Sequence, residues 1–125
     1  MQYQEFIERV QQRAGLSSFA AAEAATRATL TTLGEYLTGG EGLNLASQLP
    51  QGLAEPLRQQ PPERSKIFSL NDFVELVGEK EGAGFEEASA HAHAVMSVLG
   101  EAVSKGEMDD VRRQFPSEFD HFFES

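Results

Sequence analysis

The sequence predicts an all-α protein made of two similar helical halves that pack as a pseudo-two-fold bundle. Three observations support this prediction. Apolar residues recur at steps of three and four along most of the chain, which is the period of an amphipathic helix. Alternating runs of β-branched residues, which are typical of strands, do not occur in the sequence. A phrase that begins at Leu33, LGEYLTGGEGLNLASQLP, returns at Leu99 as LGEAVSKGEMDDVRRQFP, so the chain contains an internal repeat.

The first half, residues 1–58, begins with an expected helix whose apolar face is Tyr3, Phe6, Ile7, Val10 and Ala14. Gly15 follows and suits a left-handed helix cap. Ser17 or Ser18 is expected to cap a second, longer helix that ends at Gly39-Gly40. The segment EGLNLASQL then fits a short helix. Each half is therefore expected to contain two longer helices and one or two short ones.

Prolines divide the middle of the chain. Pro50 is expected to open a further short helix, and Pro56 is expected to interrupt it. Pro61-Pro62 stop helix formation, and polar residues surround them, so residues 59–68 are predicted to be a linker. A half of about 60 residues has a marginal core by itself. We therefore expect the halves to fold as one cooperative unit, with two separately folded beads on a tether as the alternative.

The second half, residues 69–125, repeats the pattern. Ser69 and Asp72 form a variant capping box for a helix that ends at Gly82. The next long helix is expected to end at Gly106, with Pro116 opening a last short one. The apolar face of the long helix is predicted to contain Phe85, Ala88, Ala92, Val95, Met96, Leu99 and Val103. Within the last helix, Phe119 and Phe123 are expected to enter the core, as Leu53 and Leu57 are in the first half.

The quoted phrase marks the junction between a long helix and a short one in each half. Gly40 and Gly106 are expected to adopt positive φ there. Glu41 and Glu107 then fall in the first turn of the following helix, where a carboxylate meets the positive end of the helix dipole.

The segments YQEFIERVQQRAGL, LGEYLTGGE, ASQLP, FSLNDFVELV and HAVMSVLGEAVSKGEMDDVRRQFP together give the chain a recognisable layout. In this layout the sequence resembles the bacterial domain of unknown function family DUF2267, over essentially the whole chain. The resemblance implies an all-helical fold and a bacterial source. It implies no activity, ligand or catalytic residue.

Composition argues against several classes of partner. The chain of 125 residues has a formal net charge of −10, and its few cations are scattered, so neither nucleic acid nor an anionic membrane is an expected partner. It contains no cysteine, and so no disulfide or thiolate site. We find no signal-peptide pattern at the start and no apolar run near the length that spans a bilayer. These features predict a cytoplasmic protein, either a monomer or a homodimer.

Histidines are the first candidates for chemistry. Glu87 and His91 lie four residues apart on one side of the expected helix, and His121 joins them only if the last helix folds back. His93 points to the opposite flank from His91. Glu87, His91 and His121 are weak metal candidates, because zinc takes three or four ligands. The simpler interpretation is that they flank the apolar stripe.

Four glutamates at equivalent positions are the second candidates: Glu35 and Glu101, and Glu41 and Glu107. They are expected to complement helix ends. The alternatives are polar contacts between the halves, a partner surface, or a divalent-cation site of converging carboxylates. The Glu-x-x-His motif of di-iron bundles does not occur here.

No nucleophile–base set and no complete ligand set can be assembled from the sequence, and no cofactor is expected. We therefore predict a non-catalytic protein–protein interaction module. A small-ligand or divalent-metal-binding protein is the alternative, and an enzyme with an unrecognised acidic site is a third class. Phe122 is expected to remain at the surface and to anchor a basic protein partner at the seam between the halves. The alternative is that Phe122 simply covers this seam.

Overall fold

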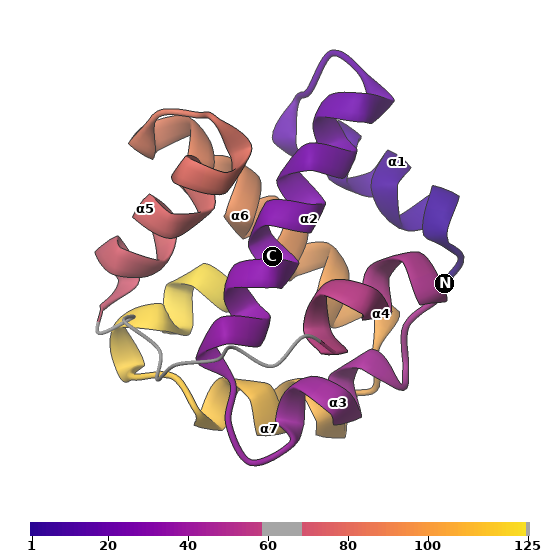
Figure 1. Ribbon diagram of the computed structural model, residues 1–125, viewed down its shortest axis with the longest axis vertical. Helices are drawn as coiled ribbons and strands as arrows, with labels where there is room; N and C mark the ends of the chain where they lie inside the picture. The colour runs from indigo at the N-terminus through magenta and orange to yellow at the C-terminus, as the bar shows by residue number, and fades with distance from the viewer. Residues whose placement is uncertain (59–68, 125) are drawn as a thin grey trace.

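The computed structural model describes residues 1–58 and 69–124, and every regular element in these ranges is helical (Figure 1). The elements of the first half are α1 (Tyr3–Ala14), α2 (Phe19–Tyr36), α3 (Glu41–Ala46) and α4 (Gln51–Arg58). Those of the second half are α5 (Leu70–Glu81), α6 (Phe85–Ala102), α7 (Lys105–Arg113) and the 3-10 helix η1 (Ser117–Phe123). The all-helical prediction is confirmed, whereas the predicted linker, 59–68, lies outside the described residues.

Local capping signals set several of these boundaries as predicted. The serine side chain of Ser18 accepts a hydrogen bond from the Ala21 backbone N–H at 3.0 Å and so caps α2. Ser69 caps α5 in the same way. Gly15 and Gly82 end α1 and α5 with φ of 65° and 75°, a conformation that glycine adopts without steric cost.

The predicted ends of both long helices are wrong. Helix α2 ends at Tyr36 rather than at Gly39-Gly40. Gly106 lies inside α7, whereas α6 ends at Ala102. Ser104 is the N-cap of α7 and accepts a hydrogen bond from the Glu107 N–H at 3.2 Å, so the sequence S-K-G-E acts as a helix start. Positive φ was predicted for Gly40 and Gly106. Gly40 has φ of 80°, as predicted, but Gly106 does not have positive φ, because it lies inside a helix.

Pro56 does not interrupt α4, which continues to Arg58. Proline removes one backbone donor, but α4 is only about two turns long and has few internal hydrogen bonds to lose. Leu53, Ala54, Pro56 and Leu57 are all buried on this helix. Burial of this apolar face outweighs the lost hydrogen bond.

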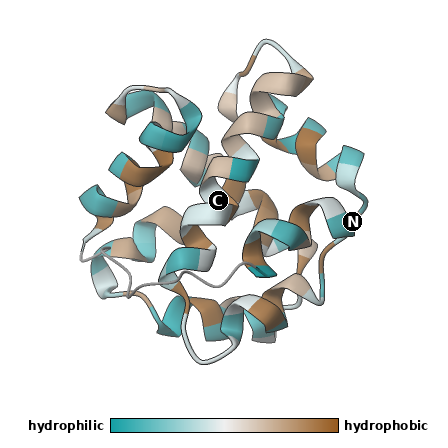
Figure 2. Ribbon diagram, viewed as in Figure 1, coloured by the Kyte–Doolittle hydropathy of each residue, from teal (hydrophilic) through white to brown (hydrophobic). Residues whose placement is uncertain are grey.

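The core is continuous and contains residues from both halves. Helices α2 and α6 contact each other, and each also contacts both α1 and α5. Hydrophobic and hydrophilic residues are interspersed along these helices, as expected for amphipathic helices (Figure 2). Helix α3 contacts α4 of its own half and α7 of the other. These contacts bring the two long-to-short helix junctions, seen in the lower part of Figure 1, close together.

An aromatic cluster joins α2 and α5 to the C-terminal end. The ring of Tyr36 stacks on Phe115 with centroids 4.2 Å apart, and Phe73 meets Phe119 edge-on at 6.0 Å. Phe119 and Phe123 are buried, as are Leu53 and Leu57 of the first half, so these core predictions are confirmed. Within residues 1–58 and 69–124, no helix combines the length and apolar character that crossing a bilayer requires.

Candidate functional site

The two junctions hold each other through matching hydrogen bonds. The Ser104 N–H donates to Gln48 Oε1 at 2.7 Å, and Gln48 Nε2 donates to Ser104 Oγ at 3.2 Å. The Thr38 N–H donates to Gln114 Oε1 at 2.8 Å, and Gln114 Nε2 donates to the Thr38 carbonyl at 3.0 Å. Gln48 and Gln114 occupy equivalent places in the repeat, so each half closes the junction of the other.

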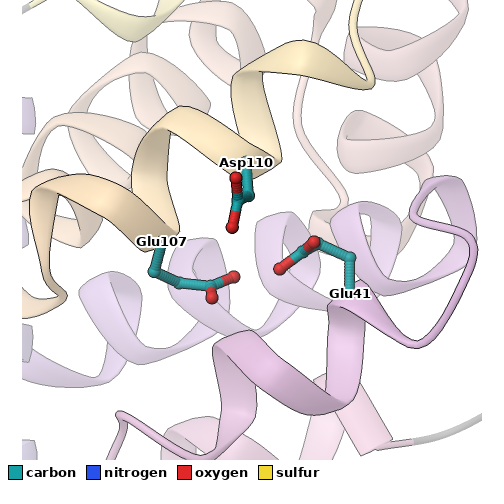
Figure 3. A group of neighbouring side chains, drawn as sticks. All are labelled: Glu41, Glu107 and Asp110. Atoms are coloured by element: carbon teal, nitrogen blue, oxygen red, sulfur yellow. The ribbon is translucent and has the colours of Figure 1, made fainter.

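Three carboxylates meet beside these hydrogen bonds. Glu41 extends from the first turn of α3, whereas Glu107 and Asp110 extend from α7. Figure 3 shows the three side chains pointing toward one another. One oxygen from each residue lies within 4.8 Å of the other two. We call this group the carboxylate cluster.

Burial makes the carboxylate cluster unusual. Glu107 is only 8% exposed, and its Oε2 has no hydrogen-bond partner among the residues that the structure describes. Glu41 Oε2 is likewise buried and unpartnered within those residues. Asp110 contacts the guanidinium of Arg113 at 2.5 Å, but Arg113 is largely exposed. Two buried carboxylate oxygens therefore lack the compensation that buried charges normally have.

The surroundings of Glu107 change its protonation. Burial raises the pKa of Glu107 to about 7. Three effects act in the same direction: the hydrogen bond that a protonated Glu107 can donate to Glu41, the charge of Glu41 and the charge of Asp110. A proton between Glu107 and Glu41 would supply the missing hydrogen bond. Near neutral pH, Glu107 is therefore expected to exchange between its protonated and ionised forms.

The other pair of predicted glutamates, Glu35 and Glu101, does not join this cluster. Glu35 forms an ion pair with Lys80 of α5 at 2.7 Å. Glu101 contacts Arg9 at 2.7 Å and also contacts Arg13, both on α1. Although burial raises the pKa of Glu101, hydrogen bonds from Arg13 and Arg9 hold it below its usual value. Both glutamates lie in the last turn of a long helix, so they make polar contacts between the halves rather than complement a helix N-terminus.

The weak metal candidates Glu87, His91 and His121 do not come together. Among the described residues, the carboxylate cluster is the group whose ligand atoms are close enough to share an ion. His91 instead contacts Glu81 at the end of α5, with 2.5 Å between Nδ1 and Oε2. The side chain of His121 is 91% exposed. His93 lies within 2.5 Å of the Glu124 carbonyl oxygen.

The prediction about the exposure of Phe122 is wrong. Phe122 was expected at the surface, but it is 6% exposed and meets Phe73 edge-on at 5.9 Å. Phe85, which was placed on the apolar face of its helix, is 47% exposed. Phe85 is the first residue of α6, so it lies beyond the part of the stripe that the neighbouring helices cover.

A groove lies next to Phe85, between α6, the start of α5 and η1. Its volume is about 390 Å³. The lining residues are Leu70, Phe85, Glu86, Ser89, Ala90, His93, Glu118, His121 and Phe122. Glu118 also accepts a hydrogen bond from the Leu70 N–H at 2.5 Å, which ties η1 to the start of α5. We call this feature the α6 groove.

The sequence of the chain matches a known protein family. Residues 3–122 match the family described as "Uncharacterized conserved protein (DUF2267)". The chain belongs to the DUF2267 family. This confirms the resemblance seen in the sequence. No curated protein matches the chain.

Two features of this DUF2267 chain escaped sequence reasoning. Asp110 follows Glu107 by three residues, so the two share a face of α7, and this spacing is a signal that could have been used. The α6 groove has no comparable signal, because it depends on how η1 lies against α6. Of the four predicted glutamates, the structure brings only Glu41 and Glu107 together.

Proposed function

We propose that this chain is a non-catalytic interaction module that binds a short basic segment of a partner protein in the α6 groove. In this proposal, an aromatic side chain of the segment enters the groove. The observation that supports the proposal is a difference between the two halves. The second half has an open groove at a place that a side chain fills in the first half.

We also propose that a pseudo-two-fold axis relates the halves. Helix α1 contacts α6 while α2 contacts α5, which is the exchange that such an axis produces. The pairs Lys80–Glu35 and Arg13–Glu101 occupy equivalent positions in the repeat. The matching glutamine hydrogen bonds at the junctions support the same relation. The α6 groove then has a counterpart between α1, α2 and α4.

That counterpart is filled by the chain itself. Tyr3 lies there, its hydroxyl donating to Glu23 Oε2 at 2.6 Å. Its ring lies so close to Gly52 that a Cβ at this glycine would be 2.9 Å from Tyr3 Cδ2. The cavity that remains is about 10 Å³. Leu70 and Glu118 stand at the equivalent positions in the second half, where about 390 Å³ stays open. The open space is one that the first half fills with an aromatic ring.

Charge indicates the rest of the partner segment. Of the described residues that line the α6 groove, Glu86 and Glu118 are acidic and none is a lysine or an arginine. The chain as a whole has a net charge of −10. Complementary charge speeds the encounter of partners and selects among them. A lysine or arginine next to the inserted aromatic residue is therefore expected, and Phe85 supplies an apolar contact at the rim.

Selection from random peptides displayed on phage tests the proposal. Enriched peptides are expected to contain Tyr or Phe beside Lys or Arg. Phe85→Ser is expected to weaken binding of a synthesised peptide about tenfold. Leu43→Ser is the matched control, because Leu43 is 48% exposed but lies on α3. Enrichment without aromatic residues, or equal binding to both variants, would refute the proposal. Binding of the free amine tyramine as tight as that of the peptides would instead indicate a small-ligand site.

A further inference from the structure

The carboxylate of Glu107 is not used for helix capping. In a capping box, the glutamate side chain bonds back to the backbone N–H of the N-cap residue. Here the N–H of the N-cap, Ser104, donates to Gln48 Oε1 of the other half. Ser104 still caps the helix by accepting from the Glu107 N–H. The carboxylate of Glu107 is thus directed away from the cap and toward Glu41 (Figure 3).

With Glu107 in this orientation, the buried carboxylate oxygens of the carboxylate cluster lack a compensating positive charge among the described residues. Glu107 is more than nine-tenths buried, and its Oε2 lacks a hydrogen-bond partner within the described part of the chain. Arg113 contacts only the Asp110 side of the group. Either a proton or a bound cation can compensate the buried oxygens. A proton can be shared by one pair of oxygens, whereas a cation can bind an oxygen of each of the three residues.

We propose that Glu41, Glu107 and Asp110 bind one hard divalent cation of the Ca²⁺, Mg²⁺ and Mn²⁺ class, which holds α3 against α7. Carboxylate oxygens are the ligands that these ions prefer. Bond lengths of about 2.0–2.6 Å allow two oxygens on one ion to be at most about 4–5 Å apart. One oxygen from each residue lies within 4.8 Å of the others, so the group fits around an ion.

The cation would connect the two halves of the molecule. Glu41 belongs to the first half, and Glu107 and Asp110 belong to the second. The site is next to the glutamine hydrogen bonds that already join the junctions. Three protein oxygens leave coordination positions for water, as is usual for Mg²⁺, or for second carboxylate oxygens, as is usual for Ca²⁺. The ion is therefore expected to stabilise the contact between α3 and α7.

Calorimetric titration of the full chain tests this site. The protein is treated with a chelator and titrated separately with Ca²⁺, Mg²⁺ and Mn²⁺ at about pH 8, because ligand carboxylates must be ionised. At least one of the three ions is expected to bind and to raise the melting temperature. Glu107→Gln and, separately, Asp110→Asn are each expected to weaken binding at least about tenfold.

Asp109→Asn is the matched control, because it removes the same charge from the same helix outside the cluster. It is expected to bind the ion as the unaltered chain does. Should Glu107→Gln fail to fold, the comparison of Asp110→Asn with Asp109→Asn decides the question. The proposal is wrong if none of the ions gives heat or a change in melting temperature, or if Asp110→Asn and Asp109→Asn weaken binding equally.

Discussion

Replacing Glu107 by glutamine should change how the stability of the metal-free protein depends on pH. The pKa of Glu107 is raised from 4.5 to about 7 by burial and by the neighbouring Glu41 and Asp110. Between these two values the folded protein holds a proton that the unfolded chain has released. The free energy of unfolding therefore falls as pH rises through this window. At about 1.4 kcal/mol for each pH unit, the loss approaches about 3 kcal/mol.

The glutamine variant has no proton to lose at this position, and its amide can donate to Glu41 as the protonated carboxyl does. Glu107→Gln and the unaltered chain should therefore be similarly stable at about pH 5. At about pH 8 the variant should be more stable by up to about 3 kcal/mol. Among residues 1–58 and 69–124, the charges that face Glu107 are those of Glu41 and Asp110, and Arg113 contacts the cluster through Asp110.

Urea unfolding, followed by far-ultraviolet circular dichroism in the presence of a chelator, measures this difference. Glu55→Gln is the control, because Glu55 is an exposed carboxylate on α4. It is expected to follow the pH profile of the unaltered chain. If Glu107→Gln and the unaltered chain lose stability in parallel from about pH 5 to 8, a different group is responsible and the reasoning fails.

Two further substitutions test the arrangement of the core. Gly34 and Gly100 are equivalent in the repeat. A Cβ at Gly34 would lie 3.0 Å from the Pro56 carbonyl oxygen of α4. A Cβ at Gly100 would meet no described atom within 4 Å. Gly100→Ala should stabilise the helix by up to about 1 kcal/mol, and Gly34→Ala should destabilise the protein by about 1–2 kcal/mol; equal effects in urea unfolding would contradict this. Phe122→Ala should lower the free energy of unfolding by about 3 kcal/mol. An unchanged free energy of unfolding would contradict the burial of Phe122.

The helices of this protein could be predicted because their signals are local. Ser18 and Ser69 bond to backbone groups three residues away, and Gly15 and Gly82 adopt their own backbone conformation. One failure occurred where two local signals compete. At the second junction, the capping serine Ser104 prevailed over the glycine that follows it.

The carboxylate cluster could be predicted only in part. Glu41 and Glu107 were paired because they occupy the same place in the repeat, and the structure brings them together. Glu35 and Glu101 had the same symmetry but lie beside Lys80 and the arginines of α1. Repetition in a sequence identifies equivalent residues, but it does not say which of them lie near the contact between the halves.

The sequence by itself determined the helical class, the family and most helix boundaries, because backbone hydrogen bonds and caps act over a few residues. Tertiary structure alone decided that Asp110 joins Glu41 and Glu107, and that Gln48 takes the hydrogen bond which would have held Glu107 at its cap. It also decided that Phe122 is buried while Phe85 is exposed. An amphipathic stripe shows which side of a helix is apolar, but how far that stripe is covered depends on the neighbouring helices that dock against it.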